Sequence, residues 1–186
     1  MKGNFPTSKF SNIDTPFYFY DVDLLKRTLS VIQEHASANN ITVHYAIKAN
    51  ANAKLLKIIS SFGFGADCVS GNEVKAAIEE GFPADKIVFA GVGKTDREIN
   101  TALSHDIFCF NAESIPELEV INELAGKKGK TARVELRVNP NVDAHTHHYI
   151  TTGLSDNKFG FNLEDIKKVI SLVQGLKNLQ FANLKL

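Results

Sequence analysis

The sequence predicts an α/β fold, a (β/α)₈ TIM barrel of which this chain carries about five to six βα units. Short apolar runs typical of buried strands alternate with amphipathic segments typical of helices. The expected strands begin about every 20 to 27 residues, a spacing that suits a barrel or a doubly wound open sheet. The first strand lacks the glycine-rich turn of a nucleotide-binding open sheet, and this favours the barrel.

The apolar runs place the barrel strands at 43–49, 64–69, 86–92, 106–110 and 133–139, with a sixth strand beginning at 184. Because a helix follows a strand four times in succession, we expect parallel strands joined by right-handed crossovers. A barrel needs eight units and typically about 250 residues. We therefore expect the chain to be one part of a longer protein.

The helices are expected at 24–38, 53–62, 73–80, 96–104 and 116–125. Asp21 or Asp23 is expected to cap the first of them. Three later helices begin with the capping boxes Ser70–Glu73, Thr95–Glu98 and Ser114–Glu117. Gly63 and Gly81 stand where two helices should end.

The N-terminal residues 1–22 form a separate segment in this prediction, and 23–186 form the partial barrel. Residues 1–14 are too polar for a core, whereas 16–20, with the sequence Pro-Phe-Tyr-Phe-Tyr, predict a further strand.

Composition and charge exclude several classes of partner. The 21 basic and 21 acidic side chains are interspersed, so no basic face indicates nucleic acid or a membrane surface. No run approaches the roughly 18 apolar residues that cross a bilayer. Cys68 and Cys109 lie in separate apolar runs, which predicts buried free thiols, and the start of the sequence lacks the apolar core of a secretory signal. A cytoplasmic location fits best.

Lys48 is the first candidate for chemistry, because it stands at the carboxyl end of the first predicted strand. Barrel enzymes place their active sites at this end of the barrel. A lysine enclosed there loses solvation, which favours the neutral amine that can attack an aldehyde. A solvated lysine at a strand end is the more common role for any lone lysine.

The residues around Lys48 carry a resemblance that decides between these roles. The run His44-Tyr-Ala-Ile-Lys48-Ala-Asn50 resembles the cofactor-lysine motif of the fold-type III pyridoxal-phosphate enzymes, which include alanine racemase and several amino-acid decarboxylases. Further stretches resemble the diaminopimelate decarboxylase family in particular; these are 15–21, 65–73, 136–140, 145–153 and 157–160. The resemblance spans about residues 15 to 186.

The resemblance implies that Lys48 forms the Schiff base to pyridoxal 5′-phosphate. It implies the α-decarboxylation of meso-diaminopimelate to L-lysine, and a homodimer whose active sites are completed across the interface. It also implies that 16–20 belongs with a C-terminal β-domain, and that the cofactor-stacking histidine, the phosphate-binding glycines and the substrate arginine follow residue 186. Two alternatives stay open: a decarboxylase of another basic amino acid, and a non-catalytic cofactor carrier or partner-binding paralogue.

Asp67 and Arg137 complete the predicted site. Asp67 ends the second strand, next to Lys48 because neighbouring strands lie about 4.8 Å apart, and is expected to support the protonated lysine. Arg137 needs an anion to offset its burial inside a barrel, and the resemblance places it beside the cofactor. An ion pair of Arg137 with Asp67 or Glu135 is the structural alternative. Glu73 matches an acidic family position, but its capping box accounts for it, so it is left out of the site.

Two further patterns are weaker. His145, His147 and His148 suggest zinc, but no second ligand cluster accompanies them, and the resemblance places them on a loop, 141–161, beside the active site. No metal is expected. Gly91-Val-Gly-Lys94-Thr95 looks like a phosphate-binding loop, but its required first glycine is replaced by Val88, so Thr95 is interpreted as a helix cap.

Overall fold

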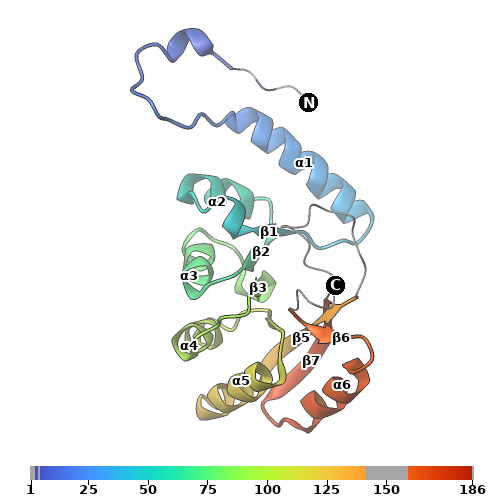
Figure 1. Cartoon of the computed structure of the whole chain (residues 1–186). Helices are drawn as coiled ribbons and strands as arrows, with labels where there is room; N and C mark the ends of the chain where they lie inside the picture. The colour runs from blue at the N-terminus through green and yellow to red at the C-terminus, as the bar shows by residue number, and fades with distance from the viewer. Residues whose placement is uncertain (1–2, 4, 141–158, 186) are drawn as a thin grey trace.

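The computed structural model describes residue 3 and residues 5–140 and 159–185. A curved sheet forms its centre, and the helices that follow the strands line the outer, convex side (Figure 1). In chain order the strands are β1 His44–Ala46, β2 Gly65–Cys68, β3 Ile87–Phe89, β4 Cys109–Ala112, β5 Ala132–Asn139, β6 Phe161–Asn162 and β7 Leu179–Lys185. The α-helices are α1 Val22–Ala38, α2 Ala53–Ser60, α3 Gly71–Glu79, α4 Asp96–Ser104, α5 Ile115–Lys127 and α6 Ile166–Gly175.

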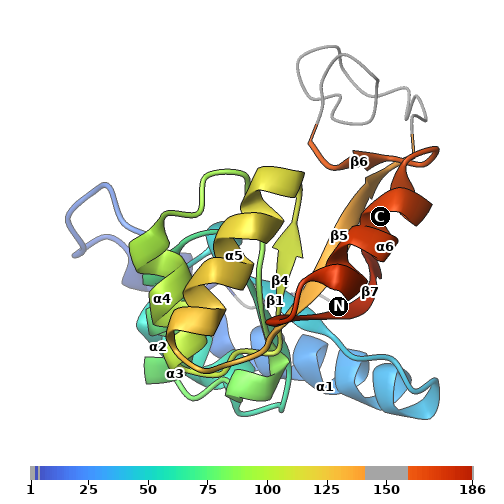
Figure 2. The same cartoon turned by 90° about the horizontal axis from the view of Figure 1, so that it is seen from below.

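Every strand pairing in the described part of the chain is parallel, which confirms the prediction from the strand–helix alternation. The sheet runs β1-β2-β3-β4-β5, and both β6 and β7 pair with β5. Figure 2 shows β7 beside β5, with the short β6 at the far end of β5. Strand β7 is thus the sixth strand of the predicted barrel series, and the carboxyl ends of all these strands meet at one edge.

The core lies between the sheet and the helices. The strands contribute the fully buried Phe89, Phe110 and Leu136, and the helices contribute Ile99 and Ile121. Burial of this apolar surface fixes which face of each strand points outward to the helices. The alternate residues point into the concave side, where the polar side chains of the sheet are found.

Helix starts follow the predicted caps. The side-chain oxygens of Asp21, Ser70, Thr95 and Ser114 each accept a backbone N–H of the helix that follows. Thr95 and Glu98 form the complete capping box. Glu73 and Glu117 do not complete the boxes predicted at Ser70 and Ser114, because their carboxylates accept the N–H groups of Val69 and Glu113 instead, at 2.7 and 2.8 Å.

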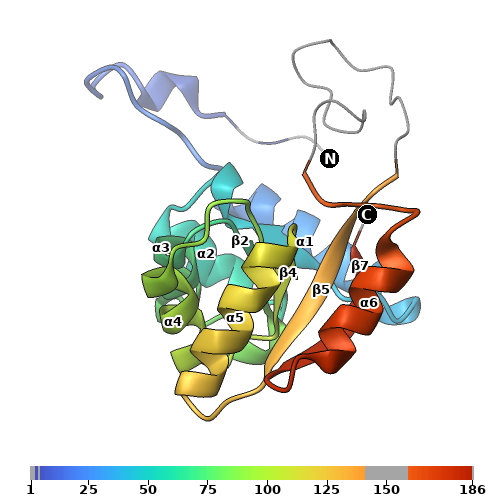
Figure 3. The same ribbon diagram turned by 60° about the horizontal axis from the view of Figure 1, so that its bottom comes forward.

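Several expected boundaries were wrong. Residues 16–20 are not a strand: Phe17 and Phe19 pack on Phe10, and the segment lies away from the sheet (Figure 3). Strand β4 continues to Ala112, beyond the expected end at 110, and β7 begins at Leu179 rather than 184. Helix α6 was not predicted. Its buried face, Ile166, Val169 and Val173, has the helical spacing that would have indicated it.

Among the described residues, no helix is both long and apolar enough to span a bilayer. Nor does that part of the chain contain a group of three or more histidine, cysteine, aspartate or glutamate side chains arranged to hold a metal ion. His145, His147, His148 and the loop predicted at 141–161 lie largely outside the described residues, which resume at Phe159.

Candidate active site

Lys48 lies just beyond the end of the first strand. Strand β1 ends at Ala46, so Lys48 lies in the 3₁₀ turn Ile47–Ala49. The expected strand, 43–49, had included this residue. The neighbouring Ile47 is fully buried and anchors this turn in the core, whereas Lys48 is exposed at the carboxyl edge of the sheet. A buried residue beside an exposed one fixes the direction in which the lysine leaves the backbone.

Asn50 organises the chain that follows Lys48. Its N–H donates to the carbonyl of Ile47 at 3.0 Å, and its carbonyl accepts the hydroxyl of Tyr45 at 3.2 Å. Its side-chain oxygen accepts the N–H of Asn52 at 3.0 Å, and its amide nitrogen donates to the hydroxyl of Tyr20 at 2.9 Å. The tyrosine, lysine and asparagine of the sequence motif therefore form one structural unit, in which two residues hold the turn that carries the third.

Asp67 lies on β2, in register with Ala46 of β1. Its Oδ2 is 3.5 Å from the Nζ of Lys185 on β7, so the ammonium group that it contacts here is that of Lys185. Its Oδ1 is buried and has no hydrogen-bond partner among the described residues. A buried carboxylate oxygen without a donor is costly, which makes this atom a candidate to accept a hydrogen bond from a bound molecule.

Arg137 projects from β5 and pairs with Glu113, the residue that follows β4. Its NH1 group donates to Oε2 of Glu113 at 2.9 Å. Within the described residues, Glu113 thus takes the place that Asp67 or Glu135 held in the sequence-based alternative. The guanidinium carbon also lies 5.9 Å from the ring centre of Phe159. Gly160 passes so close that a Cβ there would lie 2.6 Å from the carbonyl oxygen of Arg137, so the Phe159-Gly160 pair packs directly on this part of β5.

A polar network lies deeper in the concave side of the sheet. With its amide oriented to satisfy both neighbours, Asn111 donates to Oε2 of Glu135 at 2.8 Å and accepts from the Nζ of Lys185 at 2.7 Å. Burial raises the pKa of Glu135, while Cys109 and Lys185 oppose that rise. The network connects Lys185, and through it Asp67, to β4 and β5.

Several of these side chains line one cavity of about 360 Å³. Lys48, Asp67 and Arg137 all line it, so the structure brings together the three residues predicted from the sequence. It adds Asn111, Glu113, Phe159 and Lys185, which the sequence analysis did not assign. The size is within the range of pockets that bind small molecules.

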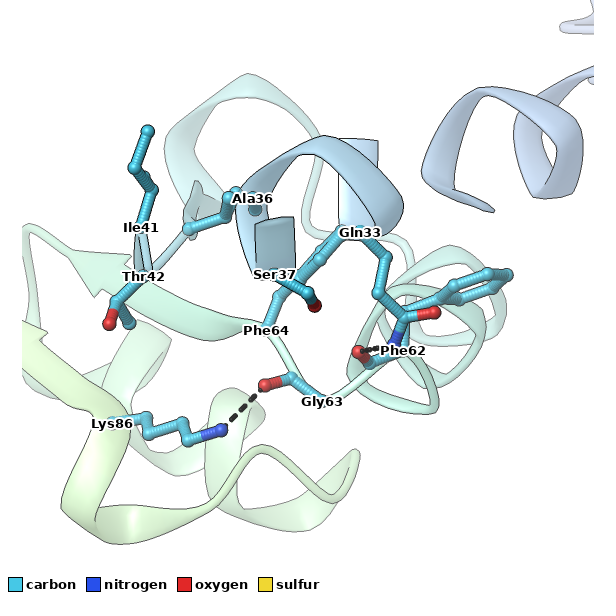
Figure 4. Close-up of a pocket in the computed structure, with 10 residues that line it drawn as sticks. Gln33, Ala36, Ser37, Ile41, Thr42, Phe62, Gly63, Phe64 and Lys86 are labelled. Carbon is cyan, nitrogen blue, oxygen red and sulfur yellow. Dashed lines mark hydrogen bonds between the residues drawn. The ribbon is translucent and has the colours of Figure 1, made fainter. Parts of the chain in front are cut away.

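A second cavity, of about 310 Å³, lies at the opposite, amino ends of β1 and β2. Figure 4 shows its lining: Lys86 donates to the carbonyl of Gly63 at 2.9 Å, and Gln33 donates to that of Phe62 at 2.6 Å. Lys86 is the one ionisable side chain in this lining, and it already has a partner. Acid–base or covalent chemistry needs several reactive groups in reach of one another, so this second cavity is not the candidate site.

The donor set of the first cavity suits a polar aldehyde cofactor. A primary amine can bond covalently to the aldehyde carbon. The guanidinium can neutralise negative charge, and the two carboxylates of Asp67 and Glu113 each retain a buried oxygen without a partner in the described residues. Pyridoxal phosphate has an aldehyde, a ring hydroxyl and a ring nitrogen that these groups can meet.

Comparison with known proteins supports this fit. Residues 23–185 match the family model of the pyridoxal-dependent decarboxylases, specifically their pyridoxal binding domain. The chain belongs to this family. It is 58% identical over 185 residues to a diaminopimelate decarboxylase of Bacteroides thetaiotaomicron, covering 99% of this chain and 48% of the relative. The corresponding enzyme of Aquifex aeolicus is 41% identical over 170 residues, covering 91% of this chain and 40% of the relative.

Solved structures of the family have the same fold. The diaminopimelate decarboxylase of Helicobacter pylori, in complex with L-lysine, superimposes with a TM-score of 0.88 at 36% identity, covering 96% of this chain and 45% of that one. The enzyme of M. jannaschii, also with L-lysine, gives a TM-score of 0.70 at 41% identity, with 77% and 33% covered. The chain thus spans about half the length of the curated relatives it matches, and its fold corresponds to the amino-terminal part of their barrels.

Proposed function

We propose that the protein containing this chain catalyses the pyridoxal-phosphate-dependent α-decarboxylation of meso-diaminopimelate to L-lysine. One observation carries the proposal: Lys48, Asp67 and Arg137, which come from three different strand ends, line a single cavity. The 58% identity to a diaminopimelate decarboxylase and the L-lysine complexes of the structural relatives support the choice of substrate and product.

Each residue has a role set by its chemistry. The Lys48 amine would hold the cofactor by a covalent bond to its aldehyde carbon. Asp67 accepts hydrogen bonds through its buried oxygen. It also stabilises positive charge on the amine of Lys48, which lines the same cavity. Arg137, held by Glu113, presents a fixed cation at the cavity wall. Bound pyridoxal phosphate would supply the electron sink for the electron pair that remains when carbon dioxide leaves.

The proposal extends to the assembly and location of the protein. We infer a homodimer, from the family resemblance of the loop region and the Lys48 motif. We infer a cytoplasmic location, because Cys68 and Cys109 are both buried free thiols, and free thiols persist in a reducing compartment. Size measurement by ultracentrifugation and cell fractionation would check these two points separately.

The central test is covalent trapping of the cofactor in the full-length protein. Borohydride reduction of the cofactor complex should leave a phosphopyridoxyl mass on the peptide that contains Lys48, because only a lysine bound covalently to the aldehyde carbon is trapped. Lys48→Ala should lose both this label and carbon dioxide release from meso-diaminopimelate while keeping its fold, since an exposed side chain leaves no core cavity.

Lys54→Ala is the matched control. Lys54 is an exposed lysine in the first turn of α2, six positions further along the chain, and its loss should leave label and turnover unchanged. A phosphopyridoxyl group on any other lysine of the parent protein, or turnover by Lys48→Ala, would remove Lys48 from the centre of the proposal.

A further inference from the structure

Lys94 has a buried ammonium group behind the wall of the candidate site. Its side chain is 1% exposed, although it belongs to the loop that joins β3 to α4. The Nζ donates to the carbonyl of Gly91 at 2.7 Å, to the carbonyl of Asn111 at 2.8 Å and to Oε1 of Glu117 at 2.5 Å. An ammonium group has three hydrogens, so these partners account for all of its donors. The ring of Phe89, centred 5.4 Å away, covers it.

The partners of Lys94 belong to segments that form the cavity. Gly91 and Asn111 both line it, and both are held by their backbone carbonyls. One lysine therefore fixes the β3–α4 loop against the end of β4. Because the bonds go to backbone atoms, they determine where these segments lie whatever their side chains are.

Glu117 extends the connection to the cation of the site. One of its oxygens binds Lys94, and the other accepts the N–H of Glu113 at 2.8 Å. The carboxylate of Glu113 in turn holds Arg137 at 2.9 Å. The side chain of Glu113 is 4% exposed and that of Glu117 is 12% exposed, so these bonds act in a region of low dielectric. A continuous series of charge-assisted bonds thus leads from Lys94 to Arg137.

A buried lysine is expensive to retain if stability alone is required, because an apolar side chain of the same volume often serves as well or better. Unlike an apolar side chain, an ammonium group donates three hydrogen bonds, and these hold three acceptors at fixed positions. We propose that Lys94 is a positioning residue of the active site: through Glu117 and Glu113 it sets the place of Arg137, and directly it sets Gly91 and Asn111. This inference rests on the proposed function.

The experiment uses the full-length protein and two variants. Lys94→Met removes the ammonium but leaves the Glu117 carboxylate buried without its cation, which lowers stability. Lys94→Met/Glu117→Gln removes both charges, and the new amide oxygen can still accept the N–H of Glu113. The double variant should therefore recover most of the thermal stability while Gly91 and Asn111 still lack their donor.

Four readouts separate positioning from support of the fold. We expect the double variant to have kcat lowered between about tenfold and about a hundredfold, because small displacements in an active site have effects of this size. The dissociation constant of pyridoxal phosphate should rise, and the visible circular dichroism of the bound cofactor should change. In the cofactor-free protein, amide hydrogen exchange at Asn111 and Glu113 should be faster by about tenfold or more.

Lys127→Met is the matched control, because Lys127 forms an ion pair with Glu123 on α5 whose two side chains are 65% and 63% exposed. It should match the parent in all four readouts. If the double variant regains stability and keeps kcat, cofactor affinity and exchange within about twofold of the parent, Lys94 is a structural residue only and the proposal is overturned.

Failure of the proposed function gives a different result. A parent protein that neither binds pyridoxal phosphate nor releases carbon dioxide would remove the function. Amide exchange in the cofactor-free variants would still decide whether Lys94 restrains Asn111 and Glu113: faster exchange supports the restraint, and unchanged exchange overturns it.

Discussion

At the scale of single residues, Gly71 shows how closely the helix starts are packed. It begins α3, and a Cβ built on it would lie 2.6 Å from Cγ and 2.9 Å from Cβ of Glu98 on the next helix. These atoms are near the backbone and cannot swing away. Gly71→Ala should therefore lower the free energy of unfolding by about 1–3 kcal/mol, the usual cost of overpacking. Urea unfolding measures the change.

Gly175→Ala provides the comparison for this prediction. Gly175 ends α6, and a Cβ there would meet nothing within 4 Å. Its replacement should be neutral or should stabilise by up to about 1 kcal/mol, because alanine has less conformational freedom to lose. Equal effects at the two positions would show that space at Gly71 is not limiting.

The site residues that could be predicted from the sequence are those that follow or interrupt the apolar runs of the predicted strands. Lys48, Asp67 and Arg137 follow or interrupt apolar runs, and the structure places all three at one cavity. Asn111 and Glu113 were missed because the fourth strand was ended at 110, so two alternating inward positions were assigned to a loop. Lys94 was passed over with the false phosphate-loop pattern. Its burial depends on contacts with β4 and α5, which no local pattern reports.

At the scale of elements, prediction succeeded where the backbone itself needs a particular residue. Gly63 and Gly81 have φ values of 75° and 87°, which favour glycine at helix ends, and Thr95 caps α4 as expected. Prediction failed where tertiary contacts decide. The β-prone segment 16–20 has no sheet to join within the described residues, and Phe17 and Phe19 pack on Phe10 instead.

Glu98 joins two neighbouring helix starts, and this predicts acid sensitivity. Its carboxylate accepts the N–H of Gly71 at 2.8 Å and binds the N–H and hydroxyl of Thr95. The bond from Gly71, then those from Thr95, lower the pKa of Glu98 below its ordinary 4.5. A lowered carboxyl pKa means that the stabilisation is complete above the unfolded-state pKa and is lost as pH falls through the folded-state pKa.

Glu98→Gln should therefore be less stable than the parent at neutral pH, and the difference should shrink as the pH falls below 4.5. Urea unfolding midpoints across this range measure it. Glu79→Gln, a change at an exposed position of α3, should instead run parallel to the parent over the same range. A constant difference between Glu98→Gln and the parent would contradict the assigned cause.

At the scale of the molecule, the described strands form an open, curved sheet rather than a closed barrel. Strand order and parallel pairing follow from the alternation of apolar runs and amphipathic segments, which is why they could be predicted. The position of the site follows as well, because parallel strands bring their carboxyl ends to one edge. What the pattern could not supply is the polar network inside the curve, which depends on the register between β2, β4, β5 and β7.

The open edge of the sheet predicts how residues 1–186 behave when produced alone. In the described part of the chain, β7 pairs with β5 on one side only, and Leu184 is 39% exposed on it. An unpaired strand edge with apolar side chains is a template for pairing with another chain. We expect the isolated residues to self-associate and to release no carbon dioxide from meso-diaminopimelate.

Leu184→Lys should weaken association, because a charge on an edge strand opposes pairing. Leu163→Lys, at a 63% exposed position outside the strands, should not weaken it. Sedimentation velocity over a range of concentrations distinguishes these outcomes, and a monomeric, cooperatively folded and active product would show that the open edge carries no such liability.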